Sequence, residues 1–106
     1  MSNILVNAPK TASRGAVIEI KALIMHPMET GFRPGPNGRI IPRNIIERFT
    51  ASWNGAEIFA MDMSPAIAAN PFVSFFALAK ESGTVVLRWT GDEGFAAEQR
   101  IDIAVE

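Results

Sequence analysis

Cysteine is absent from this 106-residue chain, and histidine occurs only once, at position 26. Without cysteine the chain has neither a disulfide nor a thiol nucleophile, although this leaves the cellular compartment undecided. With a single histidine it has few side chains suited to acid–base catalysis near neutral pH. These absences favour a binding protein over an enzyme.

Long apolar runs and a strong net charge are also missing. No apolar stretch approaches the roughly 18 residues of a membrane-spanning helix, so we expect no contact with a membrane. The formal net charge is −1, and the aromatic residues occupy predicted core positions rather than a basic platform, so we expect no nucleic-acid partner. No glycine-rich loop lies between a strand and a helix, and we expect no nucleotide or other cofactor.

The length fits one domain, residues 1–106, whose core is modest by surface-to-volume scaling. Hydrophobic residues nevertheless make up 48% of the sequence. One thin core cannot hide so many apolar side chains, so a permanent partner surface is the simplest way to bury the rest.

The pattern of apolar residues indicates strands and no long helix. In Ala16–Met25 they alternate as in a half-buried strand, and Asn54-Gly55 is the typical pair of a tight hairpin turn. The predicted strands are Asn3–Val6, Ala16–Met25, Ile45–Trp53, Ala56–Met63, Phe72–Ala79, Thr84–Thr90 and Phe95–Val105. Seven strands in this length predict an all-β, immunoglobulin-like or fibronectin-like antiparallel sandwich. The predicted core includes Phe49, Trp53, Phe59, Val85, Leu87, Trp89 and Ile101.

The strand Phe72–Ala79 is apolar on both faces, which is typical of a strand that is covered on both sides. Its own core is one cover. The second is either a loop of the same chain or a partner sheet, since obligate interfaces resemble a domain core cut in half. We regard Phe72, Phe75 and the preceding Asn70-Pro71 turn as candidate partner contacts.

His26 and its neighbours allow a chemical interpretation and a structural one. Glu29 could orient the imidazole for proton transfer, but a lone histidine at a strand end is more often hydrogen-bonded structure. Met25, His26 and Met28 place soft donors close together, as a copper site would. Core methionines explain the same spacing with fewer assumptions.

The Pro/Gly-rich loop from Phe32 to Arg43 carries three arginines and no acid. Guanidinium groups bind planar or multi-oxygen anions, so Arg33, Arg39 and Arg43 could attract a sulfonate-bearing arm or an acidic partner. An ordinary solvated loop is the alternative for each single arginine.

Several segments, in order along almost the whole chain, resemble the SoxZ family of bacterial thiosulfate oxidation. They are Ala8-Pro9-Lys10-Thr11-Ala12, Val17-Ile18-Glu19-Ile20-Lys21, His26-Pro27-Met28-Glu29-Thr30-Gly31, Ile41-Pro42-Arg43-Asn44-Ile45-Ile46, Phe49 with Asn54-Gly55, and Ala69-Asn70-Pro71-Phe72, extended by Glu81-Ser82-Gly83-Thr84 and Trp89-Thr90.

The resemblance implies a non-catalytic subunit that pairs with SoxY, whose C-terminal cysteine arm carries sulfur intermediates between the enzymes of the pathway. It also implies an obligate heterodimer, transient contacts with other Sox enzymes, and no metal or other cofactor. The chain opens directly into Ile4-Leu5-Val6 without a positively charged segment, so we expect no export signal. A subunit of this family is expected to reach the periplasm on a signal-bearing partner.

The candidate partner-binding residues are His26, Met28, Glu29, Arg33, Arg39, Arg43, Asn70, Phe72 and Phe75. Two other functions stay open on the sequence. One is a stand-alone immunoglobulin-like binding module, which predicts a stable monomer. The other is a copper-binding accessory subunit, which predicts metal in the purified protein.

Overall fold

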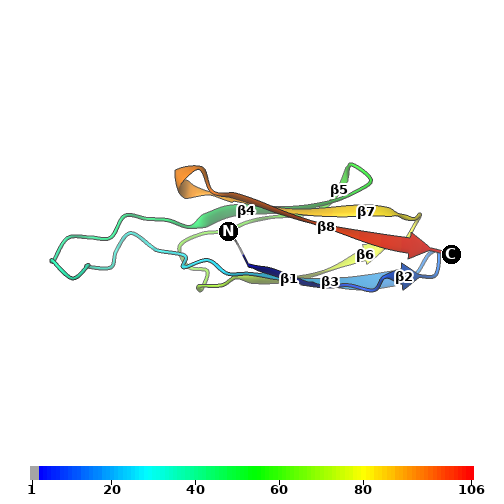
Figure 1. Cartoon of the computed structure of the whole chain (residues 1–106), viewed down its shortest axis with the longest axis horizontal. Helices are drawn as coiled ribbons and strands as arrows, with labels where there is room; N and C mark the ends of the chain where they lie inside the picture. The colour runs from blue at the N-terminus through cyan, green and yellow to red at the C-terminus, as the bar shows by residue number, and fades with distance from the viewer. Residues whose placement is uncertain (1–2) are drawn as a thin grey trace.

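The computed structural model describes residues 3–106, and residues 1 and 2, at the start of the segment in which we expect no export signal, lie outside it. Two β-sheets pack face to face, as Figure 1 shows. The strands are β1 (Ile4–Asn7), β2 (Thr11–Ala12), β3 (Val17–Ile24), β4 (Ile46–Trp53), β5 (Ala56–Asp62), β6 (Phe72–Leu78), β7 (Gly83–Gly91) and β8 (Ala96–Val105), with a 3₁₀ turn at Asp92–Gly94. No helix in residues 3–106 is long and apolar enough to cross a membrane.

One sheet has the order β1-β3-β6 and the other β2-β8-β7-β4-β5. All pairs are antiparallel except β2 with β8. The immunoglobulin-like sandwich is confirmed, and each of the seven predicted strands is present with ends that agree within one residue. The eighth strand, Thr11–Ala12, was missed because two residues are too short to show alternation. Its pairing with Ala104 and Val105 is decided by the tertiary structure.

The β1–β2 connection closes one side of the sandwich. β1 belongs to the three-stranded sheet and β2 to the five-stranded sheet, so residues 8–10 carry the chain from one layer to the other. On the opposite side the edge strands β5 and β6 belong to different sheets and follow one another through a loop. This second side of the sandwich is open, and it matters for the site described below.

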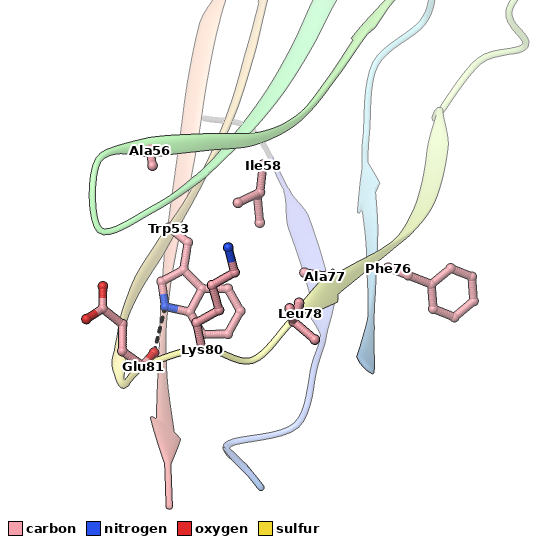
Figure 2. Close-up of a pocket in the computed structure, with 8 residues that line it drawn as sticks. All are labelled: Trp53, Ala56, Ile58, Phe76, Ala77, Leu78, Lys80 and Glu81. Carbon is pink, nitrogen blue, oxygen red and sulfur yellow. Dashed lines mark hydrogen bonds between the residues drawn. The ribbon is translucent and has the colours of Figure 1, made fainter. Parts of the chain in front are cut away.

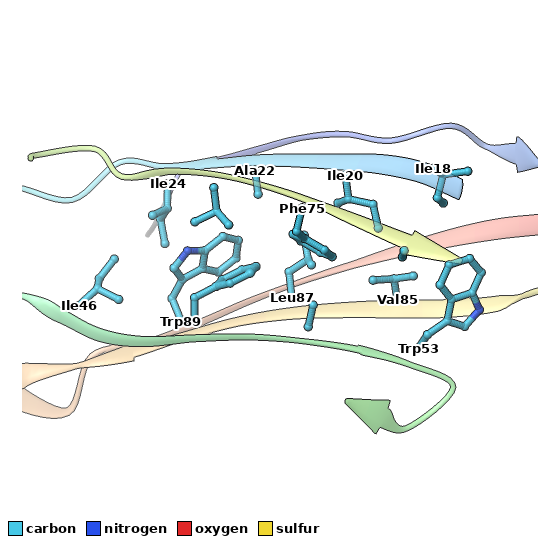
Figure 3. Packing of buried hydrophobic residues seen from close by; sticks show 14 of the residues in the cluster. Ile18, Ile20, Ala22, Ile24, Ile46, Trp53, Phe75, Val85, Leu87 and Trp89 are labelled. Atoms are coloured by element: carbon cyan, nitrogen blue, oxygen red, sulfur yellow. The ribbon is translucent and has the colours of Figure 1, made fainter. Parts of the chain in front are cut away.

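The core lies between the two sheets, and strand alternation fills it (Figure 3). Ile18, Ile20, Ala22 and Ile24 point inward from β3, as the alternation predicted. Of the predicted core residues, Phe49, Trp53, Val85, Leu87 and Trp89 are buried, whereas Phe59 and Ile101 are half-buried and pack against the core.

The β4–β5 hairpin turns at Asn54-Gly55, as predicted. Both residues have positive φ, 51° and 85°, which the tight hairpin turn requires. The Asn54 side chain also joins this turn to β7, because its Oδ1 accepts the backbone N–H of Thr84 at 3.1 Å. The hairpin is therefore fixed to the neighbouring strand as well as by its own turn.

A long arm, residues 29–44, projects from one end of the sandwich between β3 and β4 (Figure 1). Its two limbs pair at Glu29 with Asn44 and at Pro34 with Ile40, and the backbone N–H groups of Glu29 and Asn44 each donate to the other residue's carbonyl at 2.8 Å. The arm contributes to the elongated shape of the molecule, whose principal extents are 58 × 22 × 19 Å.

Candidate partner-binding site

The outer face of the three-stranded sheet exposes large apolar side chains, and we call it the apolar face. Phe72, Phe76 and Leu78 come from β6, Val17 from β3 and Leu5 from β1, and the half-buried Leu23 of β3 lies among them. Phe76 is 67% exposed and Phe72 59%. The strand register groups these residues, since Leu5 lies opposite Leu23 and Leu23 opposite Phe72, while Val17 lies opposite Leu78.

Polar side chains interrupt the apolar face at its centre. Ser74 on β6 donates its hydroxyl to Glu19 Oε2 at 2.6 Å, and Lys21 Nζ lies 3.7 Å from Glu19 Oε1. Each of these contacts is at the surface, where ion pairs contribute little stability. The face is thus an apolar surface with one polar point that can set the orientation of a partner.

A cleft of about 310 Å³ lies beside β6 on the open side of the sandwich (Figure 2). Its lining is mostly apolar and consists of Trp53, Ala56, Ile58, Phe76, Ala77, Leu78, Lys80 and Glu81. The Trp53 indole Nε1 donates to the Glu81 carbonyl at 3.0 Å, which holds the ring against the cleft. Ala56 and Ala77 leave room that larger residues would fill.

Two aromatic neighbours on β6 have opposite roles. Phe75, one of the candidate contacts, is only 3% exposed, and its ring stacks on Phe59 with centroids 4.8 Å apart. The structure therefore places Phe75 in the core, and Phe76 faces outward instead. Because β6 is apolar on both faces, the sequence alone did not distinguish the two. Residues four apart in a strand point to the same side, so an outward Phe72 would have indicated an outward Phe76.

His26 is a buried structural residue. Its Nδ1 accepts the Met28 backbone N–H at 3.0 Å, and its ring meets Phe95 edge-on with centroids 4.8 Å apart. Burial lowers the pKa of His26, although the nearby Asp92 carboxylate acts in the opposite direction. Burial thus favours the neutral ring, and His26 and Met28 are both buried, with exposures of 5% and 4%.

Two of the three soft donors considered for copper, His26 and Met28, make hydrogen bonds within the fold. The Nδ1 of His26 accepts a hydrogen bond, and Met28 Sδ accepts the backbone N–H of Ile46 at 3.3 Å. Met25 is exposed, at 48%, whereas the other two are buried. Within residues 3–106 no group of three or more His, Cys, Asp or Glu side chains is placed to hold a metal ion. These contacts favour the structural interpretation of the three residues.

Asn70 is a candidate that the structure brings next to His26. Its side-chain Oδ1 accepts the His26 backbone N–H at 2.9 Å, and its own N–H donates to the His26 carbonyl at 2.8 Å. It is exposed and has a positive φ of 54°. Asn70 therefore joins the start of β6 to the end of β3 and lies at the border of the apolar face.

Two of the three arm arginines are paired within the chain. Arg33 makes two hydrogen bonds to Glu29, with its Nη2 2.6 Å from Oε1, and this hydrogen bonding lowers the pKa of Glu29. Arg43 Nη2 lies 2.7 Å from Asp92 Oδ1 and 3.4 Å from Glu47. The expected cluster of free cations is therefore largely neutralised. The acids that pair with it, Glu29, Glu47 and Asp92, lie outside the Phe32–Arg43 loop in the sequence.

The base of the arm is held by Asp92. Its Oδ2 accepts the Ile45 backbone N–H at 3.1 Å while Oδ1 bonds to Arg43. Hydrogen bonding from Arg43 and then from Ile45 lowers the pKa of Asp92. Further out, Phe32 is 81% exposed, and Ile40 and Arg39 are exposed as well. The outer part of the arm is thus apolar and cationic.

The candidate site therefore differs in part from the one predicted. Phe72 and Asn70 lie on or beside the apolar face, whereas Glu29, Arg33, Arg39 and Arg43 belong to the arm at the end of the sandwich. The residues that sequence reasoning missed are Leu5, Val17, Leu23, Phe76 and Leu78. Alternation along β3 and β6 assigns them to the outer face, but only the sheet order shows that they form one surface.

Fold and surface together define an immunoglobulin-like β-sandwich with an exposed apolar sheet face, and large exposed apolar patches mark interaction sites. The sequence matches the family described as "Sulphur oxidation protein SoxZ" over residues 6–102. The chain belongs to this family, which places it in the Sox sulfur-oxidation system. No curated protein sequence matches it significantly.

Solved structures with low sequence identity share the fold. A superoxide reductase (neelaredoxin) from Ignicoccus hospitalis has a TM-score of 0.74 at 18% identity, over 97% of this chain and 80% of that one. A putative superoxide reductase from Thermotoga maritima has 0.72 at 15%, over 97% and 85%. The sulfur carrier protein SoxY from Chlorobium limicola f thiosulfatophilum has 0.67 at 15%, over 97% and 78%.

Proposed function

We propose that this chain is the non-catalytic scaffold subunit of a SoxYZ carrier complex, which binds SoxY and helps to present its cysteine-bound sulfur intermediates to the thiosulfate-oxidation enzymes. The observation that carries the proposal is the apolar face. In the part of the chain that the structure describes, no loop covers Phe72, Phe76 and Leu78, which remain about half exposed or more. Membership of the SoxZ family supports SoxY as the partner that we propose.

Burial of the apolar face against a stable partner has a lower free energy than leaving the face in water. Apolar surface removed from water contributes about 25 cal/mol per Å², and large exposed apolar patches mark interaction sites. A stand-alone binding module would leave this surface in water. Within the proposal, SoxY rather than a loop of the same chain is the second cover of Phe72–Ala79.

The arm serves, within this proposal, for transient contacts with the enzymes of the pathway. Its outer part exposes Phe32, Ile40 and Arg39, a combination that suits a small interface with an acidic rim. The proposal also places the complex in the periplasm, with export on a signal-bearing partner, as expected for a subunit of the SoxZ family.

Binding to the cognate SoxY tests the proposal. Mixing the two purified proteins should give a 1:1 complex, measured by size exclusion with mass determination and by calorimetric titration. Phe76→Asp places a charge on the apolar face and should weaken binding about 30-fold or more, as expected for an interface hot spot. Absence of a complex with wild-type protein would contradict the proposed function.

The matched control lies on the opposite sheet. Thr50 points outward from β4 with Arg88 as its cross-strand partner, so Thr50→Asp adds the same charge where a cation accommodates it. This variant should bind SoxY as the wild type does. Equal losses for the two variants would show that charge alone, rather than the apolar face, determines the affinity.

A further inference from the structure

We infer that SoxY binds by strand addition: an extended segment of SoxY pairs with the free edge of β6 and places an apolar side chain in the cleft beside it. This inference rests on the proposed function and specifies how the partner is held. It is carried by the edge strand, by the direction of its backbone groups and by the position of the cleft.

The four edges of the two sheets differ in how they resist pairing. β1 has four residues and β2 only two. β5 is irregular, with a register shift between Ala51 and Ser52 of its neighbour, and carries Glu57 and Asp62. Short length, bulges and charge are the usual protections of an edge. Three of the four edges thus have a recognisable protection.

β6 has none of these protections. It runs for seven residues, FVSFFAL, without a charged residue or an internal proline. Its register with β3 is continuous from Leu23–Phe72 to Val17–Leu78. A long, regular and apolar edge is a template for another strand. In a stable protein such an edge is best explained by a specific partner.

The hydrogen-bond phase shows which backbone groups are free. Ile24 donates to Pro71 at one end of β6, and Ala79 donates to Ala16 at the other. Hydrogen-bonded pairs alternate in antiparallel sheets, so Val73, Phe75 and Ala77 bond to β3. The N–H and C=O groups of the alternate residues lie in the plane of the sheet and point away from β3, toward the free edge. These are Phe72, Ser74, Phe76 and Leu78.

The side chains beside this edge provide specificity on both faces of an added strand. On the outer face, Phe72, Phe76 and Leu78 flank the position that its outward side chains would occupy. On the inner face, alternate side chains would point toward the five-stranded sheet, where the cleft lies between β6 and Trp53, Ala56 and Ile58 (Figure 2). Backbone pairing with side-chain pockets is how strand addition combines affinity with selectivity.

The occupant is a segment of SoxY that its own sandwich does not use. The inward side chains of an edge strand already within a sandwich pack in that sandwich's core and do not reach a cleft in another subunit. The Chlorobium SoxY shares this fold over 78% of its chain, which leaves about a fifth of it outside the common region. A carrier of this kind therefore has chain available for an extended segment.

Ser74 offers a sharp test, because its N–H is free and an edge strand tolerates proline at such a position. Ser74→Pro removes that donor and crowds the edge, whereas Ser74→Ala removes only the hydroxyl that bonds to Glu19. Ser74→Pro should weaken binding to the cognate SoxY about tenfold or more, and Ser74→Ala less than about threefold. Circular dichroism and thermal unfolding verify that both variants fold.

Amide hydrogen exchange by NMR tests the same inference on the wild-type complex and does not depend on a proline variant. Saturating SoxY should slow exchange at Ser74, Phe76 and Leu78 at least about tenfold. In the free chain these amides should exchange faster than Val73, Phe75 and Ala77, which bond to β3.

The outcomes separate the two proposals. If wild-type protein forms no complex, the proposed function and the inference both fail. If a complex forms but Ser74→Pro binds as Ser74→Ala does, or the three amides stay unprotected, only strand addition is overturned. Concentration-dependent protection of these amides without SoxY would identify a second copy as the occupant and would also overturn the inference.

Discussion

The two outer faces of the sandwich follow the same alternation and carry opposite chemistry. The five-stranded sheet presents cross-strand polar pairs: Arg48 with Asp62 at 2.6 Å, Arg88 with Glu98 at 3.5 Å, and Thr84 Oγ1 donating to Asp102 at 2.8 Å. The three-stranded sheet presents Phe72, Phe76 and Leu78. One face is polar and carries side-chain pairs, whereas the other leaves large apolar side chains exposed.

On both sheets, the direction of a side chain and its chemical type are therefore separate properties. Strand alternation determines which side chains point outward on both sheets, but the residue types at those positions decide whether a face is solvated or shared. Directly opposite charges stabilise the polar face locally. On the apolar face such contacts join Glu19 to Ser74 and Lys21, and under the proposed function a partner would cover the surrounding apolar residues.

The largest difference in stability should separate two neighbouring phenylalanines on β6. Phe75→Ala creates a cavity beside Phe49 and Phe59 and should reduce the free energy of unfolding by about 3–5 kcal/mol. Phe76→Ala, on the apolar face, should change it by less than about 1 kcal/mol. Urea denaturation of the isolated chain measures both.

In partner binding, Phe76→Ala rather than Phe75→Ala should have the direct effect. Phe76→Ala should weaken the affinity for SoxY, because the outward ring is available to the partner. Similar losses of stability for Phe75→Ala and Phe76→Ala would contradict the assignment of the two faces.

An intermediate effect should appear with pH, because His26 is buried, whereas the charged pairs of the polar face are exposed. Its folded-state pKa is lowered from 6.5 by burial, against the effect of Asp92. The unfolded state therefore binds more protons as pH falls below about 6.5, and the free energy of unfolding should decrease until the folded-state pKa is passed.

This pH effect is measured by denaturation between pH 7.5 and 5.5, above the range in which Asp92 and Glu29, whose pKa values are lowered, begin to titrate. NMR titration of the single histidine should give a midpoint below 6.5. His26→Gln serves as the control and should flatten the dependence. A midpoint above 6.5 would show that Asp92 outweighs burial.

The smallest effect should come from the polar face. Asp62 is 82% exposed in its pair with Arg48, and exposed pairs contribute little. Asp62→Ala should shift Tm by less than about 4 °C, and 1 M salt should remove the difference. A larger shift that survives salt would mean that the polar face contributes more to stability than its exposure indicates.

Most of the fold was predictable, because the strands carry clear local signals. The period of two in Ala16–Met25 and the Asn54-Gly55 turn act over a few residues, and both were confirmed. The candidate site was predicted less well. Phe75 and Phe76 are adjacent and chemically identical, and the backbone groups of His26 bond to Asn70, 44 residues away. Local patterns contain no information on such long-range contacts.

The arm shows the same limit. Within the arm, the loop from Phe32 to Arg43 carries three arginines and no acid, but Arg33 pairs with Glu29 at the base of the arm and Arg43 with Asp92, 49 residues later in the chain. Whether a cation is free depends on which remote acid the fold brings near it. Charge composition of a loop therefore predicts its surroundings poorly.

The sequence by itself determined that this protein is a β-sandwich of the SoxZ family with a high share of apolar residues, because these properties depend on composition and short-range patterns. Only the tertiary structure decided where the exposed apolar surface lies. Sheet order brings Leu5, Leu23 and Phe72 into one row and leaves the β6 edge open, since pairing between distant strands is set by the packing of the whole chain rather than by any one segment.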